Sequence, residues 1–400
     1  MMYVHDERIS PKLDQSTFGI GGKLGIVSGD FDGFKVNVAY YLTTDFGLRS
    51  SNPRKTDAYM FDVDKRPYSI LGEAALEYKR GDSTLLFGRQ EIDTPIVSTY
   101  DYRIIPNLFE AYTYTNKNIE NTAITLSYIT KMSGLDGLVS FKHFESMSQQ
   151  TYTSLAMSDI NTVDSNGGDT LDISRISGDQ GVLMSGIVYE SGVKIQGWNY
   201  YCKDVLDEFY VDMAYPYPLN ENLNAIVEIQ GYGVRETGRF KNFLQNLGLN
   251  GSYELFGTKL SLENKELGLT ASLAYNLFTG DAKTITAFGN WGGYPEYVAI
   301  PYMFAQDGTV SALAKSRMGK ISLKYDLAKL GLAKQTLIGG YSLIDLDESI
   351  MPHSDIHLIN LVYKAKIYDA FSLKVQYELR QSDNYRYADD MLTLSTTYRF

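Results

Sequence analysis

The segment Phe371-Ser372-Leu373-Lys374-Val375-Gln376-Tyr377-Glu378-Leu379-Arg380 alternates apolar and polar residues without a break. A β-strand directs successive side chains to opposite faces, so this segment has one apolar face and one polar, charged face. Period-two alternation over ten residues indicates a strand and not a helix, in which apolar residues recur every three or four positions. We therefore begin from a strand that separates two environments.

The same alternation recurs along almost the whole chain, for example in residues 34–42, 223–230, 267–277 and 392–400. Many of these strands span about 10–12 residues, whereas strands of soluble proteins average about 5–6. The longer value is the length that a tilted strand needs to cross the hydrocarbon of a membrane. Tyrosines gather near the strand ends, where an interfacial aromatic girdle is expected. The pattern predicts an all-β transmembrane antiparallel β-barrel.

The connections between the predicted strands alternate in length. The short connections are residues 29–32, 80–83, 117–121, 191–192, 215–221, 264–266, 326–334 and 368–370. The long connections are residues 43–67, 91–108, 132–180, 234–250, 279–311, 346–354 and 382–389, with the short 203–205 as the exception. Short turns at one rim and long loops at the other are typical of outer-membrane barrels, whose short turns face the periplasm.

Strand parity gives the size of the barrel. Counting forward from Phe18, we find 17 strands, with a short first connection and a long last one. Closure at an even number requires one preceding strand, and residues 1–5 have the character of its last part. We therefore expect 18 strands, the first only partly present in this sequence, and a single barrel domain over residues 1–400.

Bulk properties exclude several other classes. A net charge of −11 disfavours nucleic-acid binding, which requires clustered Lys and Arg. No run approaches the roughly 18 apolar residues of a membrane helix. Cys202 is the only cysteine, so no internal disulfide is possible. No signal peptide is visible at the start, so the chain is either cytoplasmic or given from a point after processing. An array of soluble β-sandwiches stays open as an alternative fold.

Between two strands, residues 88–110 carry charges of both signs and two prolines, Pro95 and Pro106. Prolines stiffen a loop and so reduce the entropy lost when it is held in one position. We interpret residues 91–108 as an inward-folded loop that narrows a pore. The residues expected at this constriction are Arg89, Glu91, Asp93, Asp101, Arg103 and Glu110. Opposed charges across a narrow neck orient dipolar solutes. The alternative is that these charges pair with one another and anchor the loop to the wall.

Charged residues within the alternating strands are expected to face water in the lumen. A Lys or Arg that faces lipid at mid-membrane costs roughly 2–4 kcal/mol. The predicted lumen-facing charges are Lys35, Glu73, Glu228, Lys320, Lys324, Lys374, Glu378 and Arg380. Most charges of a channel wall are simply hydrated, so solute contact is a further hypothesis for each.

By these features the chain resembles the OprD family of Gram-negative outer-membrane channels. The resemblance is carried by Gly88-Arg89-Gln90, Pro95, Arg103-Ile104-Ile105-Pro106 and Phe109, in that order. The glycine-rich aromatic stretch within residues 279–311 looks like the second inward-folding loop of the family. The resemblance implies a diffusion channel for small solutes, often carboxylates such as amino acids or organic acids, and commonly a trimer. The mixed lumen charges depart from the arginine ladder of better-known members.

The resemblance implies an outer-membrane location, with outer-membrane lipid and lipopolysaccharide as surroundings, small hydrophilic solutes as cargo, and a homotrimer. Two alternatives stay open: a general, weakly cation-preferring porin, and an envelope scaffold whose outer loops bind partners. We find no nucleophile motif, phosphate-binding loop or Cys/His cluster, and therefore expect no enzyme activity, no cofactor and no metal site.

Overall fold

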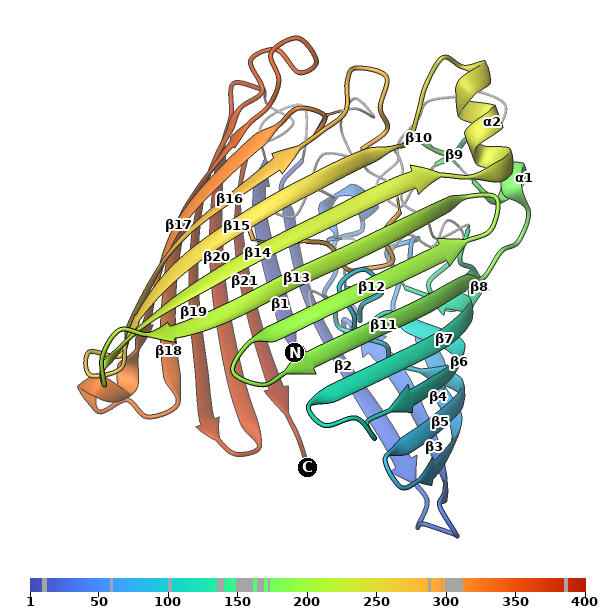
Figure 1. Ribbon diagram of the computed structural model, residues 1–400, viewed down its shortest axis with the longest axis horizontal. Helices are drawn as coiled ribbons and strands as arrows, with labels where there is room; N and C mark the ends of the chain where they lie inside the picture. The colour runs from blue at the N-terminus through green and yellow to red at the C-terminus, as the bar shows by residue number, and fades with distance from the viewer. Residues whose placement is uncertain are drawn as a thin grey trace.

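Antiparallel strands joined in chain order form nearly all of this computed structural model (Figure 1). The structure describes residues 1–8, 13–57, 60–99, 103–134, 140–148, 161–163, 169–171, 173–286, 289–295, 297–298, 312–384 and 388–400. Within these residues, 18 strands form one closed sheet, and a further short strand is added to its edge. The predicted strand number is confirmed.

The first half of the barrel consists of β1 (Met2–Arg8), β2 (Gln15–Val27), β3 (Phe34–Thr44), β4 (Ser69–Arg80), β5 (Ser83–Gln90), β6 (Leu108–Asn116), β7 (Thr122–Ser133), β11 (Val182–Glu190) and β12 (Lys194–Cys202). The second half consists of β13 (Leu206–Pro218), β14 (Leu223–Glu236), β15 (Tyr253–Asn264), β16 (Leu269–Phe278), β17 (Arg317–Asp326), β18 (Gln335–Asp345), β19 (Ile356–Tyr368), β20 (Phe371–Gln381) and β21 (Asp389–Tyr398). Each strand pairs with its neighbours in this order, and β1 pairs with β21 to close the ring.

The remaining elements lie in the connections. They are the extra strand β8 (Glu145–Ser146), the hairpin β9 (Asn161–Val163) and β10 (Asp169–Leu171), the helices α1 (Ser174–Ser177) and α2 (Gly238–Asn246), and the 3-10 turns η1 (Pro53–Lys55) and η2 (Leu327–Leu330). No helix among the described residues is long and apolar enough to cross a membrane.

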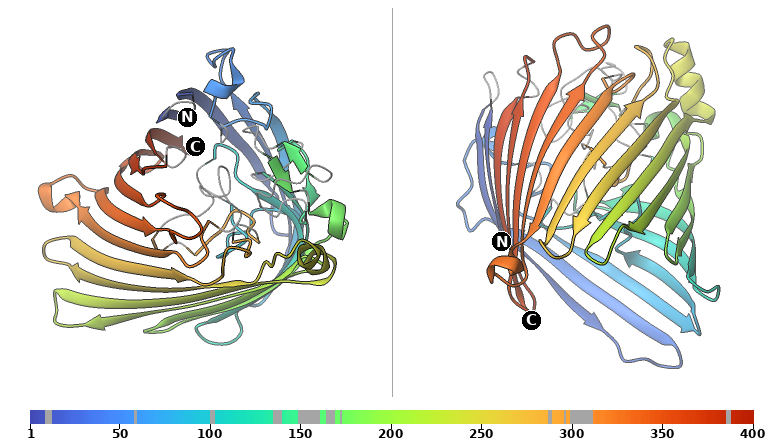
Figure 2. Two further views of the ribbon diagram at one scale, coloured as in Figure 1. Left: turned by 90° about the horizontal axis from the view of Figure 1, so that it is seen from above. Right: turned by 60° about the vertical axis from the view of Figure 1, so that its left-hand side comes forward.

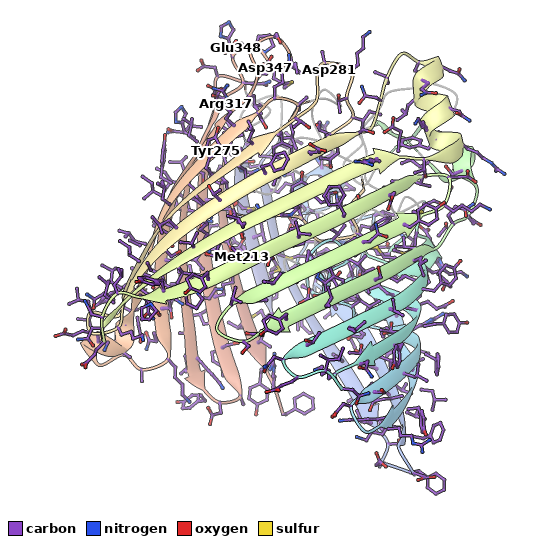
Figure 3. All side chains as sticks on the ribbon, viewed as in Figure 1. Met213, Tyr275, Asp281, Arg317, Asp347 and Glu348 are labelled. Atoms are coloured by element: carbon purple, nitrogen blue, oxygen red, sulfur yellow. The ribbon has the colours of Figure 1, made fainter. Side chains whose placement is uncertain are left out.

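The two faces of the wall differ as the alternation predicts. On β16 and β17 the outward side chains are apolar and exposed, with Leu273 58% and Ile321 59% accessible. Their neighbours Ser272 and Lys320 point to the other side of the sheet. Figure 3 shows such outward side chains along the wall, among them Tyr275. An exposed apolar outer surface of this extent fits a barrel that spans a lipid bilayer.

The strand bounds also confirm the two kinds of connection. Two residues connect β4 to β5, and two residues connect β19 to β20. At the other rim, the connection from β3 to β4 has 24 residues, 45–68. Seen from above, segments of the long-loop rim lie inside the ring of strands (Figure 2, left). The largest apolar cluster joins such loop residues to inward side chains of β6, β7 and β11–β19. The core therefore sits inside the barrel, where loops meet the wall.

One irregularity in the wall lies next to a predicted site residue. The pairing of β3 with β4 shifts register between Ala39 and Tyr40, opposite Gly72 and Glu73. Such a bulge inserts one residue and reverses the alternation beyond it. Ala39 is 2% exposed and faces inward, and Glu73 is its register partner. Glu73 therefore lies on the inner face by regular alternation with Ala75 and Glu77, and the bulge changes the facing only of the residues before it, such as Ile70.

Candidate pore constriction

Residues 91–107, here called the constriction loop, connect β5 to β6. Their first part is apolar where it meets the wall: Ile92, Ile96 and Val97 are 7%, 0% and 0% exposed and belong to the large inner cluster. Thr94 is held by a 3.0 Å hydrogen bond from the Tyr200 hydroxyl of β12. This part of the loop therefore packs against the inner wall across the barrel from β2.

The constriction loop also contacts the second segment that was expected to fold inward. Val97 forms bridge pairings with Trp291 and Gly292. The backbone N–H of Trp291 donates to the carbonyl of Ile96 at 3.1 Å, and the N–H of Ser98 donates to the carbonyl of Trp291 at 3.0 Å. The Trp291 side chain is fully buried. The two segments thus support each other by backbone hydrogen bonds and an aromatic anchor.

The last part of the constriction loop attaches on the opposite side. The Ile104 side chain fills space that the glycines of β2 leave open. A Cβ atom on Gly21 would lie only 2.0 Å from the Ile104 Cγ2 atom. Ile105 is 2% exposed in a cluster with Tyr41 and Leu108. The Arg-Ile-Ile-Pro stretch therefore fixes the loop to β2, β3 and β4 by side-chain packing.

A charged group stands on the inner wall beside the loop. Lys23 of β2 makes ion pairs with Glu73 of β4 and with Glu91, the latter at 3.2 Å between Nζ and Oε1. The Tyr41 hydroxyl donates to both carboxylates, to Glu91 at 2.7 Å. The Lys23 ammonium lies 5.3 Å from the centre of the Tyr41 ring. Two carboxylates share one cation here, so the group carries a net negative charge.

Glu91 is exposed, and its ionised form is favoured. Partial burial raises the pKa of the Glu91 carboxyl, but the Tyr41 hydroxyl and the Lys23 ammonium outweigh burial, so the pKa lies below the usual glutamate value. Asp93 is exposed and accepts a 2.8 Å hydrogen bond from the Ser98 hydroxyl. Both carboxylates of the loop's first residues are thus available to charge an aqueous passage.

Arg89 and Glu110 lie opposite each other in the pairing of β5 with β6. Strand alternation places them on the face that carries Phe87 and Tyr112, which are 36% and 57% exposed and apolar or aromatic. The Arg89 guanidinium lies 3.7 Å from the Glu110 carboxylate, and its Nη1 atom donates to the carbonyl of Leu71 at 3.0 Å. The pairing of β5 with β4 ends at Arg89 and Ala74. The hydrogen bond to Leu71 therefore joins Arg89 to the part of β4 that β5 no longer pairs with.

Arg103 is 7% exposed, buried between the Tyr68 hydroxyl and the Phe141 ring. This placement favours the anchoring alternative for Arg103 over direct contact with solute. Asp101 lies outside the described residues. For the six residues as a set, the constriction role stays a prediction.

The predicted lumen-facing charges occupy strand positions that alternate with exposed apolar residues. These are Lys35, Glu73, Glu228, Lys320, Lys324, Lys374, Glu378 and Arg380. Glu228 forms a 2.7 Å ion pair with Lys259, and Glu378 accepts hydrogen bonds from Asn360 and Gln376 at 2.9 and 2.7 Å. Arg380 pairs with Asp389 across β20 and β21.

The register of β17 to β20 groups the basic residues into rows. Lys320 is level with Arg380, through Ser342 and Leu358. Two strand positions below the row of Lys324, Lys364 stands directly opposite Lys374. Basic residues therefore recur along one side of the barrel, with Glu378 in the row between those of Lys320 and Lys324 and with Arg380 paired to Asp389. The acidic group around Glu91 is attached to β2–β5, on other strands of the ring.

Sequence reasoning missed several contributors. Lys364 was missed because Val362 and Ala365 blur the alternation around it. Tyr41 resembles any strand tyrosine, and Trp291 lies in a loop without a periodic pattern. A tryptophan in a glycine-rich loop is nevertheless a usable signal of an anchoring side chain, since exposed loops seldom carry one. In the described part of the chain, no group of three or more His, Cys, Asp or Glu side chains has a geometry that could hold a metal ion.

Comparisons with known proteins agree on one family. The sequence model of a family described as outer membrane porin, OprD family, matches residues 33–332. No curated protein sequence matches the chain at a significant level.

Solved structures with the same fold include channels of Pseudomonas aeruginosa and Acinetobacter baumannii. OccK9 (OpdG) of Pseudomonas aeruginosa superposes with a TM-score of 0.74 at 16% identity, covering 99% of this chain and 96% of that one. OccAB2 of Acinetobacter baumannii has a TM-score of 0.74 at 13% identity, covering 99% and 95%. OpdK of Pseudomonas aeruginosa, solved with vanillate, has a TM-score of 0.73 at 12% identity, covering 99% and 95%.

Proposed function

Since the chain belongs to the OprD family of outer membrane porins, we propose that it passes small amino acids or small organic acids by diffusion. It is a channel of the Gram-negative outer membrane, and its family consists of porins and not of enzymes. The choice of solute is the part that the proposal adds.

The observation that carries the proposal is the set of basic rows on β17, β19 and β20. Lys320 and Arg380 form one row, Lys324 lies four positions further along β17, and Lys364 faces Lys374 two positions beyond. At 3.3 Å per residue these rows are roughly 13 and 7 Å apart along the strand. An anion can therefore leave one row while it is already attracted by the next, which keeps binding weak and movement fast.

The acidic group supplies the opposite sign. Glu73 and Glu91 share Lys23, which leaves negative charge for the ammonium group of an amino acid. Fixed charges of opposite sign on different strands of one ring orient a zwitterion, with its carboxylate toward the lysines. The related fold of OpdK was solved with vanillate, a carboxylate, which supports this choice of solute class.

A planar-bilayer and liposome assay tests the proposal. Replacing Lys320, Lys324 and Lys374 by Gln should slow carboxylate entry about 5-fold relative to a neutral sugar of equal size, since one pair of charges near a protein surface contributes about 1 kcal/mol or more. The control is Lys329→Gln, an exposed lysine of the short turn η2. A wild-type protein that opens no pore would refute the channel itself, and an unchanged ratio would refute the role of the lysines.

A general, cation-preferring porin is the second candidate, favoured by the net charge of −11 and by the acidic group at Glu91. The reversal potential in a salt gradient separates the two candidates. A cation preference that the lysine replacements leave unchanged would favour the general porin.

We further propose that three barrels associate, as the family resemblance implies. The mass of the detergent-solubilised complex tests this, and a monomeric mass would contradict it.

A further inference from the structure

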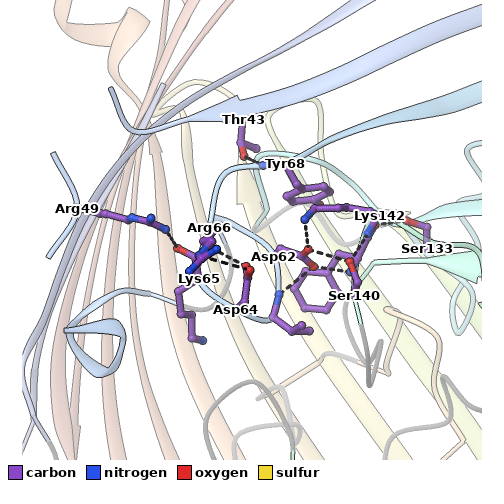
Figure 4. A network of polar contacts seen from close by, with 12 residues as sticks. Thr43, Arg49, Asp62, Asp64, Lys65, Arg66, Tyr68, Ser133, Ser140 and Lys142 are labelled. Carbon is purple, nitrogen blue, oxygen red and sulfur yellow. Dashed lines mark hydrogen bonds and ion pairs between the residues drawn. The ribbon is translucent and has the colours of Figure 1, made fainter. Parts of the chain in front are cut away.

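Three long loops meet at one point, and Figure 4 shows the contacts between two of them, through Asp62 and Ser140. One is the β3–β4 connection, represented by Asp62 and Tyr68, and another is the segment after β7, represented by Phe141. The third is the constriction loop itself, represented by Arg103. We call this arrangement the three-loop contact.

Asp62 is the polar centre of the three-loop contact. Its side chain is 2% exposed, and its Oδ1 atom accepts hydrogen bonds from the backbone N–H of Phe141 at 2.6 Å and of Val63 at 2.9 Å. Its Oδ2 atom accepts from the Ser140 hydroxyl at 2.8 Å and lies 3.0 Å from the Lys142 ammonium. One buried carboxylate thus fixes the segment after β7 to the β3–β4 connection.

Arg103 joins the constriction loop to this pair. Its guanidinium carbon lies 4.2 Å from the centre of the Phe141 ring, and its Nη2 atom donates to the Tyr68 hydroxyl at 3.1 Å. Its Nε and Nη1 atoms have no acceptor within the described part of the chain. A buried cation with so few hydrogen bonds is held chiefly by the aromatic face of Phe141. Its position therefore depends on Phe141, which Asp62 fixes.

The position of Arg103 is transmitted to the first part of the constriction loop. The N–H of Asn107 donates to the carbonyl of Thr99 at 2.8 Å, and the Asn107 side chain donates to the carbonyl of Ser98 at 3.1 Å. The Ser98 hydroxyl in turn donates to Asp93. These contacts connect residues 103–107 to Ser98, which bonds the exposed carboxylate of Asp93.

From this chain of contacts we propose that Asp62 and Arg103 are positioning residues, which set how far the constriction loop projects into the lumen. The inference rests on the proposed function, because it assumes that the constriction loop narrows the conducting path. Neither side chain contacts the solute. Their role is to keep the aperture constant.

Single-channel recording of the full-length protein tests this with Asp62→Asn and Arg103→Met. Because a hydrogen bond to a charged group stabilises considerably more than a neutral one, each change should raise the frequency of wide-open events roughly 10-fold. The reversal potential in a salt gradient should stay unchanged, since the lining charges are retained. The matched control is Asp64→Asn in the same connection, whose exposed carboxylate lies 3.7 Å from the exposed Arg66 guanidinium and accepts a 2.9 Å hydrogen bond from the Arg66 backbone N–H.

Lys142→Met is a milder second variant, because this lysine is 40% exposed and contributes one of the contacts to Asp62. Migration of unheated samples on a denaturing gel verifies that each barrel is folded. Folded variants with unchanged opening frequency would overturn the proposal. A changed reversal potential without a change in openings would instead make Arg103 a lining residue. If the wild-type protein does not conduct, the proposed function fails first, and separately.

Discussion

The two ends of the constriction loop are held by different forces. Residues 92–97 are attached by apolar burial and by backbone pairing with Trp291. Residues 103–107 are attached next to a buried carboxylate and a buried guanidinium, together with Ile104 on the glycines of β2. Apolar burial does not titrate, whereas a charged attachment depends on pH and salt. The attachment of residues 92–97 is therefore fixed, whereas the attachment of residues 103–107 can be adjusted by solution conditions.

Removing the aromatic anchor should break the apolar attachment, with the largest effect. Trp291 is fully buried, and its indole N–H donates to the carbonyl of Met147 at 2.9 Å. We expect Trp291→Ala to weaken attachment of the loop by about 3–5 kcal/mol, as for other large core truncations. Conductance should rise and protease should cleave within residues 91–99. Phe256→Ala on the outer face serves as control. Unchanged conductance and protection would contradict the anchoring role.

A smaller disturbance at the same end sharpens the comparison. A Cβ atom at Gly293 would lie 2.4 Å from the carbonyl oxygen of Pro95, so the two backbones would have to separate. We expect Gly293→Ala to cost roughly 1–3 kcal/mol, typical of overpacking, and to raise conductance less than loss of Trp291. Gly319→Ala, where nothing lies within 4 Å, is the matched control. Equal conductance of the two variants would show that the backbones of the two loops are not in close contact.

The charged end should respond to acid, with the smallest effect. Burial raises the pKa of Asp62, but the Phe141 N–H, Ser140 and Lys142 outweigh it, so the pKa lies below the usual 3.8. The ionised form is therefore favoured by the folded loops, and its stabilisation is complete above pH 3.8 and is lost as pH falls through the depressed value. Wide-open events should increase a few-fold in strongly acidic solution.

The same titration of Asp62→Asn isolates this group, because every other carboxylate is the same in both proteins. An equal response of wild type and variant to acid would assign the effect to other carboxylates. If acid changes the frequency of wide-open events in neither protein, the two ends of the constriction loop do not differ in their dependence on pH.

Sequence reasoning captured the barrel because its rule is local. Period-two alternation and strand lengths are visible within ten residues, as in residues 371–380, and the strand count follows from summing them. The inner position of Lys320 and Lys374 follows from the same rule. The inner position of Glu73 follows from it too, whereas that of Ile70 on the same strand depends on the bulge at Gly72.

The attachment of the loop could not be predicted in this way. Asp62 and Phe141 are 79 positions apart in two long connections, and nothing periodic marks either. Arg103 is a charged residue in a polar loop, so the sequence predicts an exposed side chain. In the structure the Phe141 ring covers its guanidinium group. Such contacts arise between loops only after the barrel has brought their ends together.

The seam between β1 and β21 has a consequence for biogenesis. There the backbone of Met1 exchanges hydrogen bonds with Thr396, at 2.9 and 2.8 Å, across a separation of 395 positions. Until the last strand arrives, the edge of β1 presents unpaired amides and carbonyls that invite wrong partners. Closure must therefore be the final step of assembly, and until then the unfinished edges need protection by a chaperone or by the insertion machinery.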